Sequence, residues 1–268
     1  MSHALTFGGP LARCLVTSAD GSVHAVYQDY TLKSAFQPIV AADGTLFGYE
    51  ALLRIYDRNG IQLKTEPFFS TGLLALRDRL NLERLARTIH LRNYAHFLSQ
   101  GALFLNMTPI AALDRTSQQC LQRTFMTEAE ALGVASKHIY FELLEHYTAN
   151  DQLLLHSLKS MQQHGLRIAI DDYGVDGSCE TRARCVNPDI IKVDRSLLAA
   201  YRAGQPQALQ DVLTLAHELN ARVLVEGVES ECDFDAVRRL GVDYMQGFYI
   251  GHPELASYLP RHFTPVCG

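Results

Sequence analysis

Seven short apolar runs along the chain each stop at a polar side chain, and this repetition limits the possible folds more than any other feature. The run Arg167–Ile170 ends in two adjacent carboxylates, Asp171 and Asp172. Each of the other runs ends at one polar residue: Glu50, Asn106, Glu142, Lys192, Glu226 and Gln246. Segments with helical periodicity separate most of the runs, and strands that alternate with helices form a parallel sheet. The polar residues then lie together at the carboxyl ends of the strands, where closed parallel barrels carry their ligand sites.

The chain of 268 residues is long enough for one closed α/β barrel, and no Pro-, Gly- or Ser-rich linker divides it. We therefore predict a single barrel over residues 34–262, with an N-terminal extension or flap (1–33) and a C-terminal tail (263–268). In the extension, two short apolar runs flank Asp20-Gly21 and predict a small hairpin. A second hairpin is predicted around Asp43-Gly44, which separates two apolar runs.

The charge and the cysteines exclude several classes of protein. The net charge of -5, without a basic run interleaved with aromatics, argues against binding a nucleic-acid polymer. Six cysteines show neither a CxxC motif nor paired Cys/His spacing, which favours reduced thiols in the cytoplasm over disulfides or zinc. The chain has neither a signal-peptide pattern nor an apolar span of 18 residues. A membrane-attached parent protein stays open if the chain is a fragment.

The adjacent acids Asp171 and Asp172 predict a cation between them, because two neighbouring carboxylates repel each other. A divalent metal held by hard oxygen ligands is the simplest such cation. The alternative is a helix N-cap with a solvated acid beside it, which is a common use of Asp after a strand.

Several motifs at these strand ends resemble one known family. Glu50-Ala51-Leu52-Leu53-Arg54 resembles the signature of the EAL domain, a bacterial phosphodiesterase that hydrolyses cyclic di-GMP. The resemblance covers roughly residues 35 to 255, and further motifs follow in the family's order: Gln37-Pro38-Ile39-Val40, Asn106-Met107-Thr108-Pro109, Phe141-Glu142-Leu143-Leu144-Glu145, Asp171-Asp172-Tyr173-Gly174, Ile191-Lys192-Val193-Asp194, Glu226-Gly227-Val228-Glu229 and Gln246-Gly247-Phe248.

This resemblance implies a TIM-like (β/α)8 barrel with an irregular, partly antiparallel first strand. It also implies an Mg²⁺- or Mn²⁺-dependent enzyme that hydrolyses cyclic di-GMP to linear pGpG with a metal-activated water. Inhibition by Ca²⁺ and a homodimer are further expectations. Two cations about 3.5–4 Å apart would stabilise both the attacking and the leaving oxygen of such a reaction.

The resemblance also assigns roles to single residues. One metal would be held by Glu50, Asn106, Glu142 and Asp171, and Asp171 with Asp172 would reach a second. Lys192 would touch the attacking water or the phosphate, and Glu226 would act as general base or through a metal-bound water. Substrate would be contacted by Arg54, Gln37 and Gln246, with Glu145 and Glu229 supporting the site from behind.

Simpler interpretations stay open for several of these residues. Arg54 could form a surface salt bridge, Lys192 could be an ordinary strand-end lysine, and Gln37 could satisfy backbone groups in its hairpin. Glu145 and Glu229 could be acids in the first turn of a helix, which the helix dipole favours.

The loop after Asp172 departs from the family. The family usually has Asp-Asp-Phe-Gly-Thr/Ala-Gly-Tyr-Ser-Ser, whereas this chain has Val175, Asp176 and Gly177 after Tyr173-Gly174. Asp176 puts a Cβ and a charge where a glycine is usual. Reduced activity is therefore compatible with the sequence. So is a second function, a receptor or protein-interaction module that binds cyclic di-GMP without hydrolysing it. A third possibility is an unrelated barrel metalloenzyme.

Overall fold

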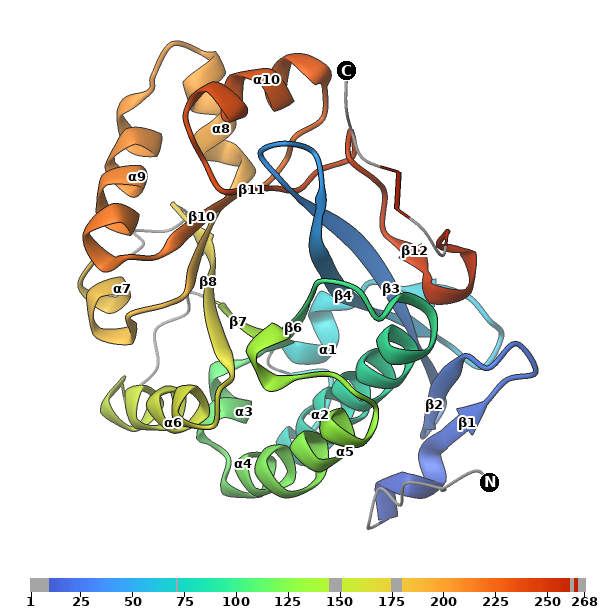
Figure 1. Cartoon of the computed structure of the whole chain (residues 1–268). Helices are drawn as coiled ribbons and strands as arrows, with labels where there is room; N and C mark the ends of the chain where they lie inside the picture. The colour runs from blue at the N-terminus through green and yellow to red at the C-terminus, as the bar shows by residue number, and fades with distance from the viewer. Residues whose placement is uncertain (1–9, 71, 145–150, 175–179, 261–262, 265–268) are drawn as a thin grey trace.

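The computed structural model describes residues 10–70, 72–144, 151–174, 180–260 and 263–264. Its strands close into a barrel with helices around the outside (Figure 1). The closed ring runs through β3, β4, β6, β7, β8, β9, β10 and β11 before it returns to β3. The TIM-like barrel expected from the sequence is therefore confirmed.

The strands of the barrel follow the apolar runs of the sequence. They are β3 (Tyr30–Ala41), β4 (Leu46–Tyr56), β6 (Ala102–Met107), β7 (Ile139–Leu144), β8 (Arg167–Tyr173), β9 (Ile190–Val193), β10 (Arg222–Val225) and β11 (Tyr244–Met245). Pairings from β4 through β11 are parallel, whereas β3 pairs antiparallel with both β4 and β11. The partly antiparallel first strand follows from the tight turn at Asp43-Gly44, where Gly44 has a φ of 80°.

Helices connect the parallel strands and cover the outside of the barrel. Those of eight residues or more are α2 (Leu76–Asn93), α6 (Asp151–Gln163), α8 (Arg195–Arg202), α9 (Gln207–Leu219) and α10 (Glu231–Arg239). Shorter ones are α1 (Glu66–Phe69), α3 (Pro109–Leu113), α4 (Arg115–Cys120), α5 (Met126–Ala131) and α7 (Glu180–Val186). Their ends follow local chemistry, because the Ser230 side chain caps α10 by accepting from Asp233 N. Within the described part of the chain, none of the helices is long and apolar enough to cross a membrane.

An antiparallel sheet continues the barrel at its N-terminal side. The predicted hairpin forms from β1 (Leu15–Thr17) and β2 (Val23–Tyr27), and β2 then pairs with the start of β3. Asn93 of α2 fixes this hairpin through two 2.7 Å hydrogen bonds with the backbone of Val23. On the other side, β5 (Gln62–Leu63) pairs with β4, and β12 (Glu254–Leu255) pairs with β3. The domain boundaries near residues 33 and 262 stay predictions.

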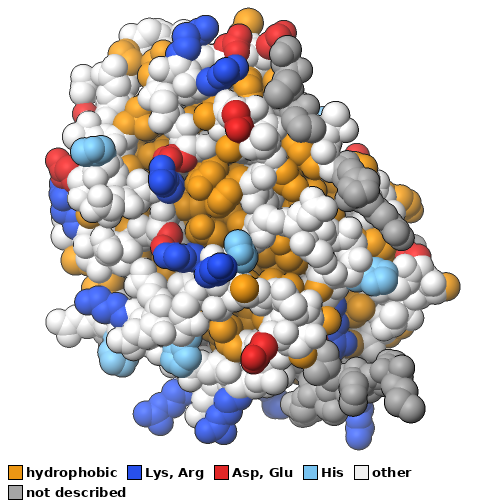
Figure 2. Space-filling view, viewed as in Figure 1, with side chains coloured by type: hydrophobic (Ala, Val, Ile, Leu, Met, Phe, Trp, Pro, Cys, Tyr) orange, Lys and Arg blue, Asp and Glu red, His pale blue; other side chains and the backbone are white. Residues whose placement is uncertain are grey.

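The inside of the barrel is filled by side chains in levels. One level is apolar and contains Ile39, Ala102, Phe104, Ala169, Ile190 and Leu224, with Phe47, Tyr140 and Tyr244 packed against it. Four of these rings, Phe47, Phe104, Tyr140 and Tyr244, contact one another and are called the aromatic plug below. Figure 2 shows hydrophobic side chains gathered at the centre of the ring on the viewed face. The plug closes one end of the barrel and leaves the other end for polar residues.

Candidate active site

A ring of polar side chains lies two residues beyond the apolar level on seven of the eight barrel strands, and on β4 Glu50 lies three residues after Phe47. Side chains alternate between the two faces of a strand, so a residue two places after an interior residue also faces the interior. Phe104 is thus followed by Asn106, Tyr140 by Glu142, and on β3, which runs in the opposite direction, Ile39 is preceded by Gln37. This polar layer consists of Gln37, Glu50, Asn106, Glu142, Asp171, Lys192, Glu226 and Gln246.

Lys192 lies at the centre of the polar layer and contacts four carboxylates. Its Nζ is 2.6 Å from Glu142 Oε1, 2.8 Å from Asp171 Oδ1, 2.8 Å from Glu226 Oε1 and 3.7 Å from Glu50 Oε2. The side chain is only 1% exposed. An ammonium group has three hydrogens, so it cannot satisfy four acids at once. The predicted residues therefore converge on one point, and negative charge is in excess there.

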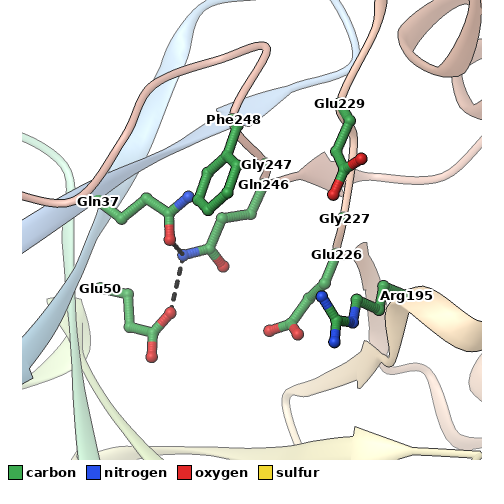
Figure 3. Close-up of a pocket in the computed structure, with 9 residues that line it drawn as sticks. All are labelled: Gln37, Glu50, Arg195, Glu226, Gly227, Glu229, Gln246, Gly247 and Phe248. Atoms are coloured by element: carbon green, nitrogen blue, oxygen red, sulfur yellow. Dashed lines mark hydrogen bonds between the residues drawn. The ribbon is translucent and has the colours of Figure 1, made fainter. Parts of the chain in front are cut away.

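Amide side chains hold the wall of the site beside Glu50. Gln246 Nε2 donates to Glu50 Oε2 at 2.7 Å and to Gln37 Oε1 at 3.2 Å (Figure 3). Asn106 Nδ2 donates to the other oxygen of Glu50 at 3.3 Å. Gln37 in turn donates to Gly251 O at 3.1 Å, a backbone group of the segment after β11 and not of its own hairpin. Glu50 is therefore oriented from two sides as an acceptor.

A β-bulge brings the two adjacent acids to the same site. The register of β8 with β9 shifts between Ile170 and Tyr173, and Asp172 has a φ of 55°. A regular strand would point the second acid to the opposite face, whereas a bulge re-aims it. Carboxylate oxygens of Asp171, Asp172 and Glu226 consequently all lie within 4.8 Å of one another. The helix-cap interpretation of this pair is wrong, because β8 continues through Tyr173.

Burial makes the charged forms of these acids costly. Burial and then the nearby Glu50 carboxylate raise the pKa of Glu142 well above its usual range. Burial likewise raises the pKa of Glu226 to about 8, and burial with the neighbouring Asp171 raises the pKa of Asp172. Burial opposes the charge of Lys192, but the surrounding carboxylates outweigh it and raise the Lys192 pKa well above its ordinary value.

The arrangement fits a hard divalent cation. Glu142 is fully buried, and its Oε2 has no hydrogen-bond partner within the described parts of the chain. Glu142 Oε1 and Asp171 Oδ1 contact Lys192 only as ion pairs, without hydrogen-bond geometry. Buried carboxylate oxygens that lack donors are costly unless a cation meets them. Glu226 lies beside Asp171 and Asp172, which gives it the position of a ligand as well as that of a base.

A cavity of about 170 Å³ opens beside this cluster. It is lined by Gln37, Glu50, Arg195, Glu226, Gly227, Glu229, Gln246, Gly247 and Phe248 (Figure 3). The loops after β10 and β11 form most of its wall, with β3 and β4 opposite. Five of the predicted residues, Gln37, Glu50, Glu226, Glu229 and Gln246, thus face a space that a ligand can enter.

Two other predicted residues, Arg54 and Glu229, lie outside the polar layer. Arg54 is on the same face of β4 as Glu50 but four residues, or about 13 Å, further along the strand. It is half-buried and donates to Leu53 O. Glu229 is exposed and lines the cavity; because Ser230 caps α10, Glu229 precedes the first turn of the helix. Glu145 and the altered loop at residues 175–179 lie outside the described residues.

Two residues at the cavity were not predicted from the sequence. Arg195 begins α8, and Phe248 follows Gln246-Gly247. The Phe248 side chain is 54% exposed, which is unusual for a large apolar residue beside a buried site. A basic residue directly after the strand end Lys192-Val193-Asp194 was the available signal for Arg195.

Comparison with known proteins agrees with this geometry. The family profile described as "EAL domain" matches residues 24–253. The chain belongs to the EAL domain family. Among curated relatives, the cyclic di-GMP phosphodiesterase PdeF of Escherichia coli K12 is 36% identical over 225 residues, which are 81% of this chain. The chain spans 29% of PdeF and 56% of the EAL-domain protein YkuI of Bacillus subtilis, so these relatives are considerably longer.

Solved structures of EAL proteins have the same fold. A standalone EAL protein from Vibrio cholerae O395, in its c-di-GMP-bound form, superposes with a TM-score of 0.74 at 25% identity and covers 86% of this chain and 95% of its own. YkuI in complex with c-di-GMP and calcium gives a TM-score of 0.71 at 25% identity, covering 84% of this chain and 55% of YkuI. Those EAL proteins therefore bind the cyclic dinucleotide, and YkuI does so with a divalent ion.

Proposed function

We propose that this EAL domain is a divalent-metal-dependent phosphodiesterase that hydrolyses cyclic di-GMP to linear pGpG. The observation that carries the proposal is the convergence of Glu50, Glu142, Asp171 and Glu226 on the single ammonium of Lys192, beside an open cavity. The naming of PdeF as a cyclic di-GMP phosphodiesterase and the ligand of the Vibrio structure support the choice of substrate.

Glu50, Asn106, Glu142 and Asp171 would hold one metal ion, and Asp171 with Asp172 and Glu226 would hold a second. The metal supplies a Lewis acid for the phosphate and lowers the pKa of water to near neutrality. The unpartnered oxygens of the buried acids support this ligand set. Hard cations such as Mg²⁺ and Mn²⁺ match its carboxylate and amide oxygens, and we expect Ca²⁺ to bind without supporting turnover because it accepts looser geometry.

The chain's own residues would perform the remaining tasks. Glu226 lies at the cavity beside Asp171 and Asp172, so it would accept a proton from the attacking water. Lys192 would offset negative charge next to the scissile phosphate. Gln246 fixes Glu50 and presents its own Oε1, which is buried without a partner in the described structure, as an acceptor for substrate or water. Arg54 and Gln37 would contact more distant parts of the substrate.

The homodimer and the cytoplasmic location are also proposals. The homodimer rests on the family resemblance, and the cytoplasmic location rests on the cysteine pattern. Light scattering of the purified chain would measure the oligomeric state.

The test is incubation of the purified chain with cyclic di-GMP and Mg²⁺ or Mn²⁺, followed by chromatographic detection of pGpG. We expect turnover that stops on addition of a chelator, and binding without turnover in Ca²⁺. Tight binding of cyclic di-GMP with no product in either active metal would contradict the enzyme and support the receptor. Restoring Gly at position 176 in the same assay would measure how much the altered loop limits the rate.

A further inference from the structure

Asn106 is the polar-layer residue near the end of β6, and few contacts hold its side chain. Within the described chain that side chain makes one hydrogen bond, from Nδ2 to Glu50 Oε1 at 3.3 Å, and the residue is exposed. This bond leaves the amide oxygen Oδ1 for a cation. The ladder between β6 and β4 ends at Leu105, although the ladder with β7 continues to Met107. The direction of the Asn106 side chain therefore depends on how the chain is held just beyond β6.

Glu83 of α2 binds the residue that follows β6. Its Oε1 accepts from Thr108 Oγ1 at 2.5 Å, and its Oε2 accepts from Thr108 N at 3.4 Å. The Thr108 hydroxyl also accepts from Ala111 N at 3.3 Å and so caps α3. One carboxylate thus binds both the backbone donor and the side-chain donor of Thr108. Glu83 therefore fixes the main chain two residues after Asn106.

Arg87 holds Glu83 in turn. It lies one turn later on α2, and its Nη1 donates to Glu83 Oε2 at 3.2 Å. The two side chains are only 6% and 8% exposed, so this ion pair is buried. Taking two charges out of water costs free energy that their attraction repays only in part, and apolar residues of similar volume often stabilise a protein as well or better. The presence of this pair is therefore explained better by what it holds than by stability.

The neighbouring ion pair of α2 has different contacts. Arg84 Nη2 binds Asp114 Oδ2 at 2.7 Å, and the same carboxylate caps α4 by accepting from Ser117 N. In the described structure neither Arg84 nor Asp114 hydrogen-bonds to β6 or to Thr108. This pair joins α2 to an outer helix, whereas the Glu83–Arg87 pair joins α2 to the end of a barrel strand. The two pairs therefore offer a matched comparison on one helix.

We infer that Glu83 is a positioning residue: held by Arg87, it fixes Thr108 and thereby directs the Asn106 side chain to the metal. The inference rests on the proposed function for the role of Asn106 as a metal ligand. Glu83 acts through the backbone and touches neither the metal nor the reacting atoms. Groups that orient a metal ligand from behind typically change metal affinity or activity by about 10- to 100-fold when they are mutated.

The experiment removes these contacts in two independent ways. Thr108→Val deletes the hydroxyl and keeps the shape, and Thr108→Ser is the conservative variant that keeps the hydroxyl. Glu83→Met combined with Arg87→Met replaces the buried pair by apolar side chains, so that neither charge is left buried alone. Asp114→Asn is the matched control, because it breaks the neighbouring ion pair while its amide oxygen can still cap α4. Calorimetric titration of Mn²⁺ into the chelator-treated proteins measures metal affinity without turnover, and thermal melting measures stability.

We expect the Mn²⁺ affinity to fall about tenfold or more in Thr108→Val and in the double variant, and to stay near the wild-type value in Thr108→Ser. The double variant should melt in chelator at or above the wild-type temperature, because apolar side chains replace a buried ion pair. Asp114→Asn should melt lower and bind Mn²⁺ as wild type does. The loss of kcat/KM for cyclic di-GMP in Thr108→Val should be largest at limiting Mn²⁺ and should shrink as Mn²⁺ is raised.

Wild-type Mn²⁺ affinity in Thr108→Val or in the folded double variant would overturn the inference, as would equal losses in Thr108→Ser or Asp114→Asn. If the double variant does not fold, the two Thr108 variants decide alone. Failure of the proposed function gives a different result: wild type would then bind Mn²⁺ without hydrolysing cyclic di-GMP, and the affinity series would still test Glu83. A wild type that binds no Mn²⁺ would overturn both.

Discussion

In the aromatic plug four rings contact one another, whereas in the polar layer of the same barrel one lysine contacts four carboxylates. Phe47 stacks on Tyr244 with centroids 3.7 Å apart, and Phe104 stacks on Tyr140 at 4.5 Å. Charged groups at the strand starts are also paired. Asp189 and Asp243 each accept from an arginine and from a backbone N–H: Arg167 with Ile168 N, and Arg222 with Val223 N.

The hydrogen-bonding groups of the polar layer are not all paired in this way. Glu142 Oε2 and Gln246 Oε1 are buried without hydrogen-bond partners within the described chain. One end of the barrel is arranged for stability, and the other keeps unsatisfied groups that only a ligand can meet. The difference predicts that mutations at the two ends separate stability from activity.

The largest stability change is expected in the aromatic plug. Phe104 is fully buried, so Phe104→Ala should lower the free energy of unfolding by about 3–5 kcal/mol through lost burial and a cavity. Denaturant unfolding measures this, with Phe104→Leu as a control that should cost less than Phe104→Ala because it removes fewer buried atoms. The activity of folded Phe104→Ala should change much less than that of Asp171→Asn. If Phe104→Ala lost activity without losing stability, the two ends of the barrel would not differ in their contributions to stability and activity.

Asp171→Asn should show the opposite behaviour. It removes an oxygen charge shared by both metal positions, so kcat/KM for cyclic di-GMP should fall by more than about 100-fold. The metal-free protein should keep its melting temperature or gain a little, because one repelling carboxylate is gone. Asp243→Asn at the other end is the control and should retain turnover. Wild-type rates in Asp171→Asn would disprove the metal site.

The pH dependence of stability sharpens the comparison further. The Glu226 pKa is raised from 4.5 to about 8 by burial, so the folded state keeps a proton that the unfolded state loses. Its contribution to stability is complete below about pH 4.5 and is lost as the pH rises to about 8. The melting temperature in chelator should therefore decline across this range, and less steeply in Glu226→Gln. Parallel curves for the two proteins would contradict the raised pKa.

The smallest effect is expected from Arg222→Ala. The Arg222 side chain is 67% exposed, and its 2.5 Å pair with Asp243 is therefore screened by solvent. We expect a loss of about 0.2–1 kcal/mol in the free energy of unfolding, smaller still at high salt, and no change in turnover. Denaturant unfolding at low and high salt measures it. A loss above the Phe104→Ala value would show that the strand-start pairs, and not the rings, stabilise this end.

The sequence predicted the barrel and the polar layer because both depend on a period of two and on parallel strand order. Glu142 and Lys192 both lie near the carboxyl ends of parallel barrel strands, so the topology alone brings them to the same end of the barrel. The bulge at Asp172 could not be predicted in this way, because it depends on how β8 pairs with β9. Arg195 was not predicted as a site residue, because it begins α8, and no helix was predicted over residues 195–202. Phe248 belongs to the motif Gln246-Gly247-Phe248, but its exposure depends on the tertiary structure and not on the local sequence.

The antiparallel pairing of β3 with β4 and β11 affects the order in which the site can form during folding. Gln37 and Glu50 face each other across one hairpin, so this corner forms from neighbours in the chain. Gln246 reaches the same corner only when β11 docks beside β3 and seals the seam. Because contacts so distant in sequence form late as a rule, a nascent chain would remain inert until its final barrel strand is in place.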